Sequence, residues 1–254
     1  MKIGLISNNE PDYQRIAKKI IKILKKHKMD FEIYNKIRKA KCDILIVVGG
    51  DGTIFKATKE YPNAMLLPIK RLKPRSSISK ILEKIKKGEH NVEKFMRLEV
   101  IFKGLKRWGI NDIVVFRDDE NANRFRIYSD GKDIYGDEII GDGVVVATPY
   151  GSTGYNWAAG GPVLKENEKK FVVTPICSSY FNKKLIAKNR FVKKKIERSK
   201  IIPDNKEIVI KFFRNLKNKI IPDGRNEERV YANIKTGDKL LIRKSNRYSK
   251  FIKF

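Results

Sequence analysis

The sequence predicts an α/β fold with a mostly parallel sheet, followed by an all-β region. In residues 1–91, uninterrupted apolar runs alternate with amphipathic segments, the pattern of a parallel sheet covered by helices. From residue 92 onward, short strand segments separated by Asp-Gly and Gly-Asp turns dominate, and helical signals become scarce. The chain has 254 residues, of which 41% are hydrophobic, enough to bury a core. We therefore expect an α/β domain at 1–91, an all-β domain at 92–240, and a segment at 241–254 that returns to the first domain.

The first domain alternates strands and helices in chain order. Residues 2–7 form an apolar run typical of a buried strand, and 12–28 carry Ile16, Ile20, Ile23 and Leu24 on one helical face. The run 43–48 (DILIVV) is apolar throughout, which is typical of a central parallel strand. The remaining expected elements are strands at 31–34 and 65–69, a short helix at 53–59, and a helix at 77–87 closed by Gly88.

The second domain is expected to consist of strands. Their ranges are 95–102, 110–116, 124–129, 133–140, 144–148, 171–175, 207–213, 229–234 and 239–243. Glycine-containing turns separate several of them, including Asp223-Gly224.

The formal charge of +28, from 57 Lys+Arg against 29 Asp+Glu, has three readings: a nucleic-acid surface, attraction of small polyanions, or a compositional habit of the source. Abundant Lys, Glu and Ile with a single glutamine, Gln14, favour the last of these, as in proteins of hot environments. The two cysteines, Cys42 and Cys177, stand too far apart for a CxxC site and indicate a reducing compartment. No apolar run approaches the roughly 20 residues of a membrane span, so we expect a cytoplasmic protein.

The motif Gly49-Gly50-Asp51-Gly52-Thr53 follows the buried strand and begins a short helix. In an open α/β sheet ligands bind at this position, and glycines let a polyanion approach the backbone N–H groups of a helix start. An aspartate in a phosphate site requires a metal or a proton to act on, so Asp51 is a candidate metal ligand or proton acceptor. A tight turn with a capping aspartate is the alternative interpretation.

The second motif, DGVVVATPYGSTGYNWAAGGP at 142–162, is longer and more distinctive. A buried strand leads into a loop that combines glycines, hydroxyls, an amide and aromatic rings. Such a loop can contact ribose, phosphate and adenine together, whereas the alternative is a Gly/Ser-rich surface loop.

These motifs resemble those of the NAD kinase family. The chain shares GGDGT at 49–53, Asn111-Asp112, the segment 142–162, TPIC at 174–177 and Asp223-Gly224, in the family's order and spacing. The resemblance implies an NAD-kinase-like fold, with a phosphate site in the first domain and nucleotide binding and oligomerisation in the second. It also implies transfer of the γ-phosphoryl group of ATP, or of polyphosphate, to the 2′-hydroxyl of the adenosine ribose of NAD. Mg²⁺ or another divalent metal, NAD and ATP as ligands, and a dimeric or tetrameric homo-oligomer come with that resemblance.

The resemblance also assigns roles to residues. Asp51 matches the catalytic proton acceptor and, with the ATP phosphates, a possible metal ligand. The residues that match nucleotide contacts are Gly49, Gly50, Gly52, Thr53, Asn111, Asp112, Asp142, Ser152, Thr153, Tyr155, Asn156, Ala158 and Asp223.

Several positions depart from the family pattern. Residues 66–79 (LLPIKRLKPRSSIS) replace a glycine-rich segment that helps form the adenine pocket in relatives. Asp112 replaces a glutamate, Gly154 an alanine, Tyr150 a threonine, and Ile140 a frequent basic residue. The family's C-terminal helix is expected to be shortened.

Two basic runs account for much of the charge. Residues 183–200 carry a net +8, which a solvated helix face would explain, and residues 70–87 carry a net +7. Because the second run replaces the glycine-rich segment, we expect a contact to substrate phosphates from one of its first four cations, Lys70, Arg71, Lys73 or Arg75.

Three functions remain open from the sequence: an NAD kinase, a phosphotransferase of the same fold acting on another hydroxyl, and a basic protein that binds nucleotide or nucleic acid without catalysis. No nucleic-acid-binding motif supports the third function. His27 and His90 lack a second ligand at metal spacing, and Ser152 has no histidine near it in sequence.

Overall fold

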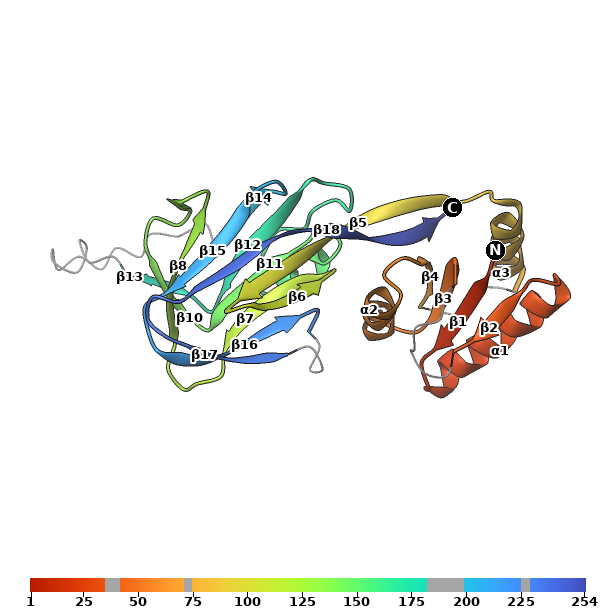
Figure 1. Ribbon diagram of the computed structural model, residues 1–254, viewed down its shortest axis with the longest axis horizontal. Coiled ribbons are helices and arrows are strands. Elements are labelled where there is room, and N and C mark those ends of the chain that lie inside the picture. The colour runs from red at the N-terminus through yellow and green to blue at the C-terminus, as the bar shows by residue number, and fades with distance from the viewer. Residues whose placement is uncertain (35–41, 71–74, 182–198, 225–228) are drawn as a thin grey trace. The chain divides into compact units, whose positions relative to one another are not determined.

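The computed structural model describes residues 1–34, 42–70, 75–181, 199–224 and 229–254. The chain divides into two compact units, one formed by residues 1–95 and 248–254 and the other by 96–247 (Figure 1). Within the described ranges, no helix is both long and apolar enough to span a bilayer. The α/β and all-β classes expected from the sequence are both present.

The first unit is built on a parallel sheet in the order β4-β3-β1-β2. Its strands are β1 (Ile3–Ser7), β2 (Phe31–Ile33), β3 (Ile44–Val48) and β4 (Met65–Ile69). Strand β3 is central and all five of its residues are buried, as its uninterrupted apolar run predicts. The mostly parallel sheet is therefore confirmed.

Three helices accompany this sheet: α1 (Pro11–Lys26), α2 (Asp51–Glu60) and α3 (Arg75–Lys87). Helix α1 buries the predicted face, and its isoleucines join the strands in one core with Ile78, Leu82 and Ile85 of α3. Helix α2 begins at Asp51, two residues earlier than expected, so Gly50 and not the aspartate is the N-cap residue. Gly88, with a φ of 75°, follows α3 as predicted.

The second unit contains two antiparallel sheets. One has the strand order β14-β12-β11-β7-β16-β17, and the part of the other that lies in this unit has the order β13-β10-β8-β15-β18, with β5 paired to β18 and β6. The strands are β5 (Asn91–Phe102), β6 (Leu105–Gly109), β7 (Asp112–Arg117), β8 (Asn123–Ser129), β9 (Lys132–Asp133), β10 (Glu138–Gly141), β11 (Gly143–Ala147), β12 (Lys170–Ile176), β13 (Ser179–Phe181), β14 (Lys200–Pro203), β15 (Glu207–Phe212), β16 (Leu216–Pro222), β17 (Val230–Ile234) and β18 (Lys239–Lys253).

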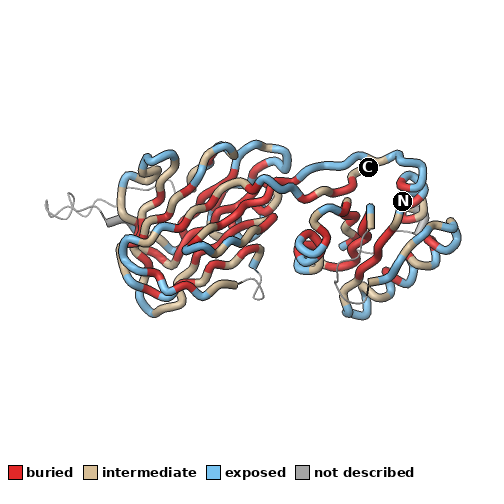
Figure 2. Tube along the Cα trace, viewed as in Figure 1, coloured by how far each residue is buried: buried red, intermediate tan, exposed pale blue. Residues whose placement is uncertain are grey.

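Alternate residues of these strands form the main core of the second unit. Ile113 and Val115 of β7 pack in one cluster with Ile208 and Ile210 of β15, so the facing sides of the two sheets are apolar. Buried segments run along the strands of this unit in Figure 2. Val114 points to the opposite side of its sheet, where it clusters with Val145, Ala147 and Ile176. Both faces of β7 and β11 are therefore covered.

The structure differs from the predicted elements in three places. The range expected as one strand at 133–140 is divided into β9 and β10, because the chain turns at Gly136, where φ is 75°. The strand expected at 239–243 continues to Lys253 and replaces any C-terminal helix. The strands β6, β13, β14 and β16 were not predicted, and residues 182–198, which hold most of the basic run at 183–200, lie outside the described ranges.

Candidate functional site

The GGDGT motif forms the turn from β3 into α2. The Gly49 N–H donates to the carbonyl of Ile69 at 3.2 Å, and the Thr53 and Ile54 N–H groups donate to the carbonyl of Gly50. A Cβ at Gly49 would lie 2.5 Å from Oγ1 of Thr53, so the turn itself requires glycine there. Among the described residues, no atom lies within 4 Å of a Cβ built on Gly52, and a Cβ built on Gly50 has the Tyr13 hydroxyl as its one neighbour within that distance. The two latter glycines therefore leave the helix start open to a ligand.

Asp51 is the first residue of α2, and among the described residues no side chain caps this helix. The capping aspartate of the alternative interpretation is therefore wrong, whereas the tight turn that it included is present. The Asp51 carboxylate instead forms an ion pair with the ammonium group of Lys70, the residue that follows β4. About half of each side chain is exposed.

Of the cations expected to contact phosphates, Lys70 is the one whose side chain the structure describes. Arg71 and Lys73 lie outside the described ranges, and so does the side chain of Arg75. The expectation for those three residues stays a prediction.

Metal binding by the protein alone is not supported among the described residues, because they include no group of three or more His, Cys, Asp or Glu side chains that could hold an ion. A single exposed carboxylate such as Asp51 nevertheless fits the usual Mg²⁺ site of kinases, where one or two carboxylates share the ion with substrate phosphates.

In the second unit, Asp223 fixes the segment that carries Asn111 and Asp112. Its Oδ1 accepts the Asn111 N–H at 2.7 Å, and its Oδ2 accepts the Ile110 N–H at 3.1 Å. Its own N–H donates to the carbonyl of Asp112 at 3.0 Å. The Asp223 carboxylate therefore accepts the backbone N–H groups of residues 110–112, and its contact with a nucleotide stays a prediction.

Thr148, at the end of β11, holds the same segment from the other side. Its hydroxyl donates to the carbonyl of Ile110 at 2.6 Å and accepts the Gly151 N–H at 3.1 Å, while its N–H donates to the carbonyl of Asn111 at 2.8 Å. A Cβ at Gly151 would lie 2.1 Å from that same Asn111 oxygen. We call residues 109–112, held between Thr148 and Asp223, the clamped segment.

The side chains of the clamped segment combine burial with unused polar groups. Oδ1 of Asn111 is buried and has no hydrogen-bond partner among the described residues. Asp112 is 4% exposed, and burial, followed by the negative charge of Asp223, raises its pKa from 3.8 to about 7. An orphaned acceptor beside a carboxyl group is chemistry that suits a ligand with hydroxyl groups.

A buried arginine lies within electrostatic reach of Asp223. Arg97 of β5 is 1% exposed, and its guanidinium carbon lies 4.2 Å from the centre of the Trp108 ring. Burial, and to a smaller extent the charge of Arg247, lower the pKa of Arg97 to about 10, with the charge of Asp223 acting in the opposite direction.

The loop after β11 folds onto the outer face of its sheet through a single π-helical turn at Ser152–Asn156. Ser152 and Asn156 are fully buried and hold the loop itself. The Ser152 hydroxyl donates to the carbonyl of Pro149 at 2.7 Å and accepts the Leu164 N–H at 2.9 Å. The Asn156 amide donates at 3.0 and 2.9 Å to two carbonyls and accepts the Thr174 hydroxyl at 2.8 Å.

The other predicted residues of this loop face solvent. Thr153, Tyr155 and Ala158 are exposed, and so is Trp157, at 67%. Burial first, and then the charges of Cys177, Asp112 and Asp142, raises the pKa of Tyr155. The phenol therefore lies within electrostatic reach of both predicted aspartates.

Asp142 pairs with a residue that the sequence did not single out. Oδ1 of Asp142 accepts from Nε of Arg117 at 2.6 Å, and the Arg117 N–H donates to the carbonyl of Asp142 at 2.8 Å. Arg117 is the last residue of β7, which pairs with β11. It gives Asp142 a basic partner although Ile140 replaces the basic residue that is frequent at that position in relatives. The strand register that brings the two together could not be read from the sequence.

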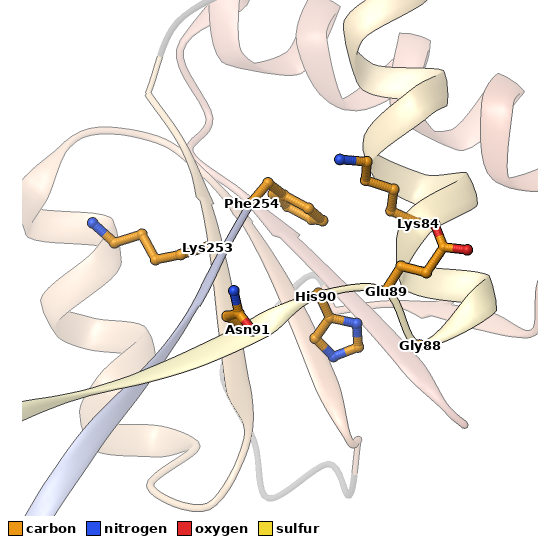
Figure 3. Close-up of a pocket in the computed structure, with 7 residues that line it drawn as sticks. All are labelled: Lys84, Gly88, Glu89, His90, Asn91, Lys253 and Phe254. Atoms are coloured by element: carbon orange, nitrogen blue, oxygen red, sulfur yellow. The ribbon is translucent and has the colours of Figure 1, made fainter.

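A separate hollow of about 340 Å³ lies in the first unit, where α3 ends and β18 finishes (Figure 3). Its lining includes Lys84, His90 and Phe254, and the Lys84 ammonium lies 6.0 Å from the centre of the Phe254 ring. None of the residues of the two sequence motifs lines it.

Comparison with known proteins gives a consistent result. Residues 111–254 match the family model of the ATP-NAD kinase C-terminal domain. An NAD kinase of Carboxydothermus hydrogenoformans is 32% identical over 229 residues, covering 84% of this chain and 75% of that protein.

Two solved structures share the fold. A yeast NADH kinase complexed with NADH aligns with a TM-score of 0.79 at 17% identity, covering 100% of this chain and 83% of that one. An NAD kinase from Archaeoglobus fulgidus in complex with ATP aligns with a TM-score of 0.73 at 22% identity, covering 100% and 94%.

Proposed function

The chain belongs to the NAD kinase family, and we propose that it transfers the γ-phosphoryl group of ATP to the 2′-hydroxyl of the adenosine ribose of NAD, producing NADP. The observation that carries the proposal is the clamped segment. Asp223 and Thr148 hold its backbone from two sides, and it carries the orphaned Asn111 oxygen beside the Asp112 carboxyl. We propose that these two side chains bind the ribose hydroxyls of NAD.

The loop after β11 supports nucleotide binding in the same unit. Ser152 and Asn156 use their polar atoms to fix the loop, and this leaves Thr153, Tyr155 and Ala158 exposed on a preorganised backbone. We propose that these exposed residues contact the nucleotide, whereas Ser152 and Asn156 position them. A fixed loop lowers the entropy lost on binding.

Asp51 is proposed as the proton acceptor of the transfer. The 2′-oxygen forms a new bond to the γ-phosphorus, the bond from that phosphorus to the β,γ-bridging oxygen breaks, and its electron pair leaves with ADP. The hydroxyl proton passes to the Asp51 carboxylate at the start of α2. The N–H groups of this helix start, beside Gly50 and Gly52, bind donor phosphates.

A divalent metal is part of the proposal. Asp51, together with donor phosphates, would hold Mg²⁺, which when bound neutralises charge on those phosphates. Similarity to a family member solved with ATP supports ATP rather than polyphosphate as the donor.

We also propose a homo-oligomer that assembles through the second unit. The two edge strands of its six-stranded sheet carry large exposed apolar side chains, Ile201 on β14 at 47% and Tyr231 on β17 at 67%. Light scattering coupled to gel filtration measures the oligomeric state, and a monomer would contradict the proposed homo-oligomer.

Two free cysteines support a reducing compartment such as the cytoplasm.

The test of the activity is a product assay with ATP and Mg²⁺ against a panel of acceptors: NAD, NADH, inositol, nucleosides and lipids. We expect NADP to form from NAD. Inositol, nucleosides and lipids should not be phosphorylated. Phosphorylation of another hydroxyl compound in place of NAD would favour the second function left open by the sequence. Nucleic-acid binding that weakens steeply with salt and survives Asp51→Asn, with no product from any acceptor, would favour the third.

A further inference from the structure

The ion pair between Lys70 and Asp51 connects the end of β4 with the glycine turn that follows β3. Lys70 directly follows β4, and Asp51 opens α2 two residues after Gly49, whose N–H bonds the last residue of β4. Their side chains are 48% and 57% exposed, so water reaches both groups.

An ammonium group at this position is not needed to stabilise the turn. The turn is already closed by backbone hydrogen bonds from Gly49, Thr53 and Ile54, and an ion pair exposed to this extent contributes little to folding. A weak exposed pair can exchange one partner for another of higher charge. Phosphate oxygens bear more negative charge than one carboxylate and accept hydrogen bonds from an ammonium group readily.

We propose that Lys70 binds the terminal phosphoryl group of the donor, an inference that rests on the proposed function of the GGDGT turn. When the donor enters, its γ-phosphate takes the Lys70 ammonium from Asp51. This exchange places the cation on the group that carries the charge of the transition state. Lys70 keeps its own protons throughout, and only the ribose proton moves, to Asp51.

The experiment compares ATP with ADP, because the two nucleotides differ in the terminal phosphoryl group alone. The variants are Lys70→Met, which removes the charge, Lys70→Arg, which keeps it, and Lys56→Met as the matched control. Lys56 is an exposed lysine on α2, five residues and about 7.5 Å of helix beyond Asp51. Binding is measured by calorimetry with Mg²⁺ and either nucleotide in the absence of NAD.

We expect Lys70→Met to weaken ATP binding about 10- to 100-fold, the value of one charged hydrogen bond. ADP binding should change by less than about threefold, since only screened, longer-range attraction to that nucleotide is lost. The ATP affinity of Lys70→Arg should stay within about tenfold of that of the unmodified protein. The control Lys56→Met should bind ATP as tightly as the unmodified protein. Unchanged ATP binding in Lys70→Met, or an equal loss for ATP and ADP, overturns the proposal.

The outcome is separable from the test of the proposed function. Absence of NADP synthesis by the unmodified protein would refute the activity, but discrimination of ATP from ADP by Lys70 is measured by binding and needs no turnover. Conversely, an active enzyme whose Lys70→Met variant binds ATP normally would leave the activity standing and remove Lys70 from it.

Discussion

Replacing Asp223 by asparagine tests whether the clamp on residues 109–112 forms the proposed ribose site. The two nearest backbone N–H donors to the aspartate are Asn111, at 2.7 Å, and Ile110, at 3.1 Å, while the Asp112 N–H donates at 3.4 Å. An amide of the same shape has one acceptor oxygen. Whichever way it is oriented, an NH₂ group then faces one of the two N–H donors.

The magnitude follows from these contacts. Hydrogen bonds to a charged acceptor contribute about 1.5–3 kcal/mol each, and a donor left without an acceptor costs about 1–3 kcal/mol. One bond is lost outright and the other loses its charge, so we expect the free energy of unfolding to fall by about 2–4 kcal/mol. If half of that loss, about 1–2 kcal/mol, is expressed as displacement of Asn111 and Asp112, the KM for NAD rises about 5- to 30-fold.

Asp133→Asn is the matched control. Oδ1 of Asp133 also accepts two backbone N–H groups, from Tyr135 at 3.0 Å and Gly136 at 2.9 Å, and its Oδ2 accepts from Arg126 at 3.1 Å. It lies in the same unit but outside the predicted site. Urea unfolding and steady-state kinetics on both variants separate the effects, because both should lose stability and only Asp223→Asn should raise the KM for NAD.

Two results would refute this reasoning. An Asp223→Asn variant as stable as the unmodified protein would mean that the carboxylate does not hold the clamped segment. A KM for NAD that rises equally in both variants would mean that the effect is general loosening of the second unit and not displacement of Asn111 and Asp112.

Three further predictions follow from the same structure. Asp51→Asn should keep the fold and lower kcat by about 10²–10⁴-fold, the usual contribution of a general base, and near-normal turnover would remove Asp51 from that role. The pKa of Asp112 is raised to about 7 in the folded state, so the folded protein holds a proton that the unfolded chain releases near pH 4. The free energy of unfolding should therefore fall by at most about 4 kcal/mol as the pH rises from about 4 to 7. Urea unfolding of Asp112→Asn should not show this decline. Thr148→Val, which keeps the shape of a fully buried side chain but removes the hydroxyl between Ile110 and Gly151, should lower the free energy of unfolding by about 2–4 kcal/mol, and calorimetry showing no loss would argue against the clamp.

Sequence patterns predicted the first unit well because each of its elements has a strong local signal. The apolar run of β3 and the helical face of α1 need no partner to be recognised, and the glycine turn follows directly from them. The start of α2 was predicted two residues too late, because Asp51 and Gly52 are poor helix residues and the helix begins there because of the turn.

The second unit was predicted less completely, because its contacts depend on strand register. Asp223 lies 112 positions after Asn111, and the pairing of β16 with β7 alone brings them together. The same is true of Arg117 and Asp142, which β7 and β11 place opposite each other. Family resemblance indicated Asp223 as a nucleotide contact, which stays a prediction; that its oxygens accept backbone N–H groups of residues 110–112 could be found only from the coordinates.

Strand β18 has a consequence for how the chain is made. Its residues Lys250 and Phe251 pair with Met65 and Leu66 at the edge of the parallel sheet, and Ile252 enters the core of the first unit. During synthesis, β4 emerges from the ribosome roughly 10–35 s before this last segment, at about 5–20 residues per second. Until then one edge of an apolar sheet is unpaired, which is the condition for strand-to-strand aggregation. We therefore expect the nascent chain, more than the finished protein, to depend on chaperones.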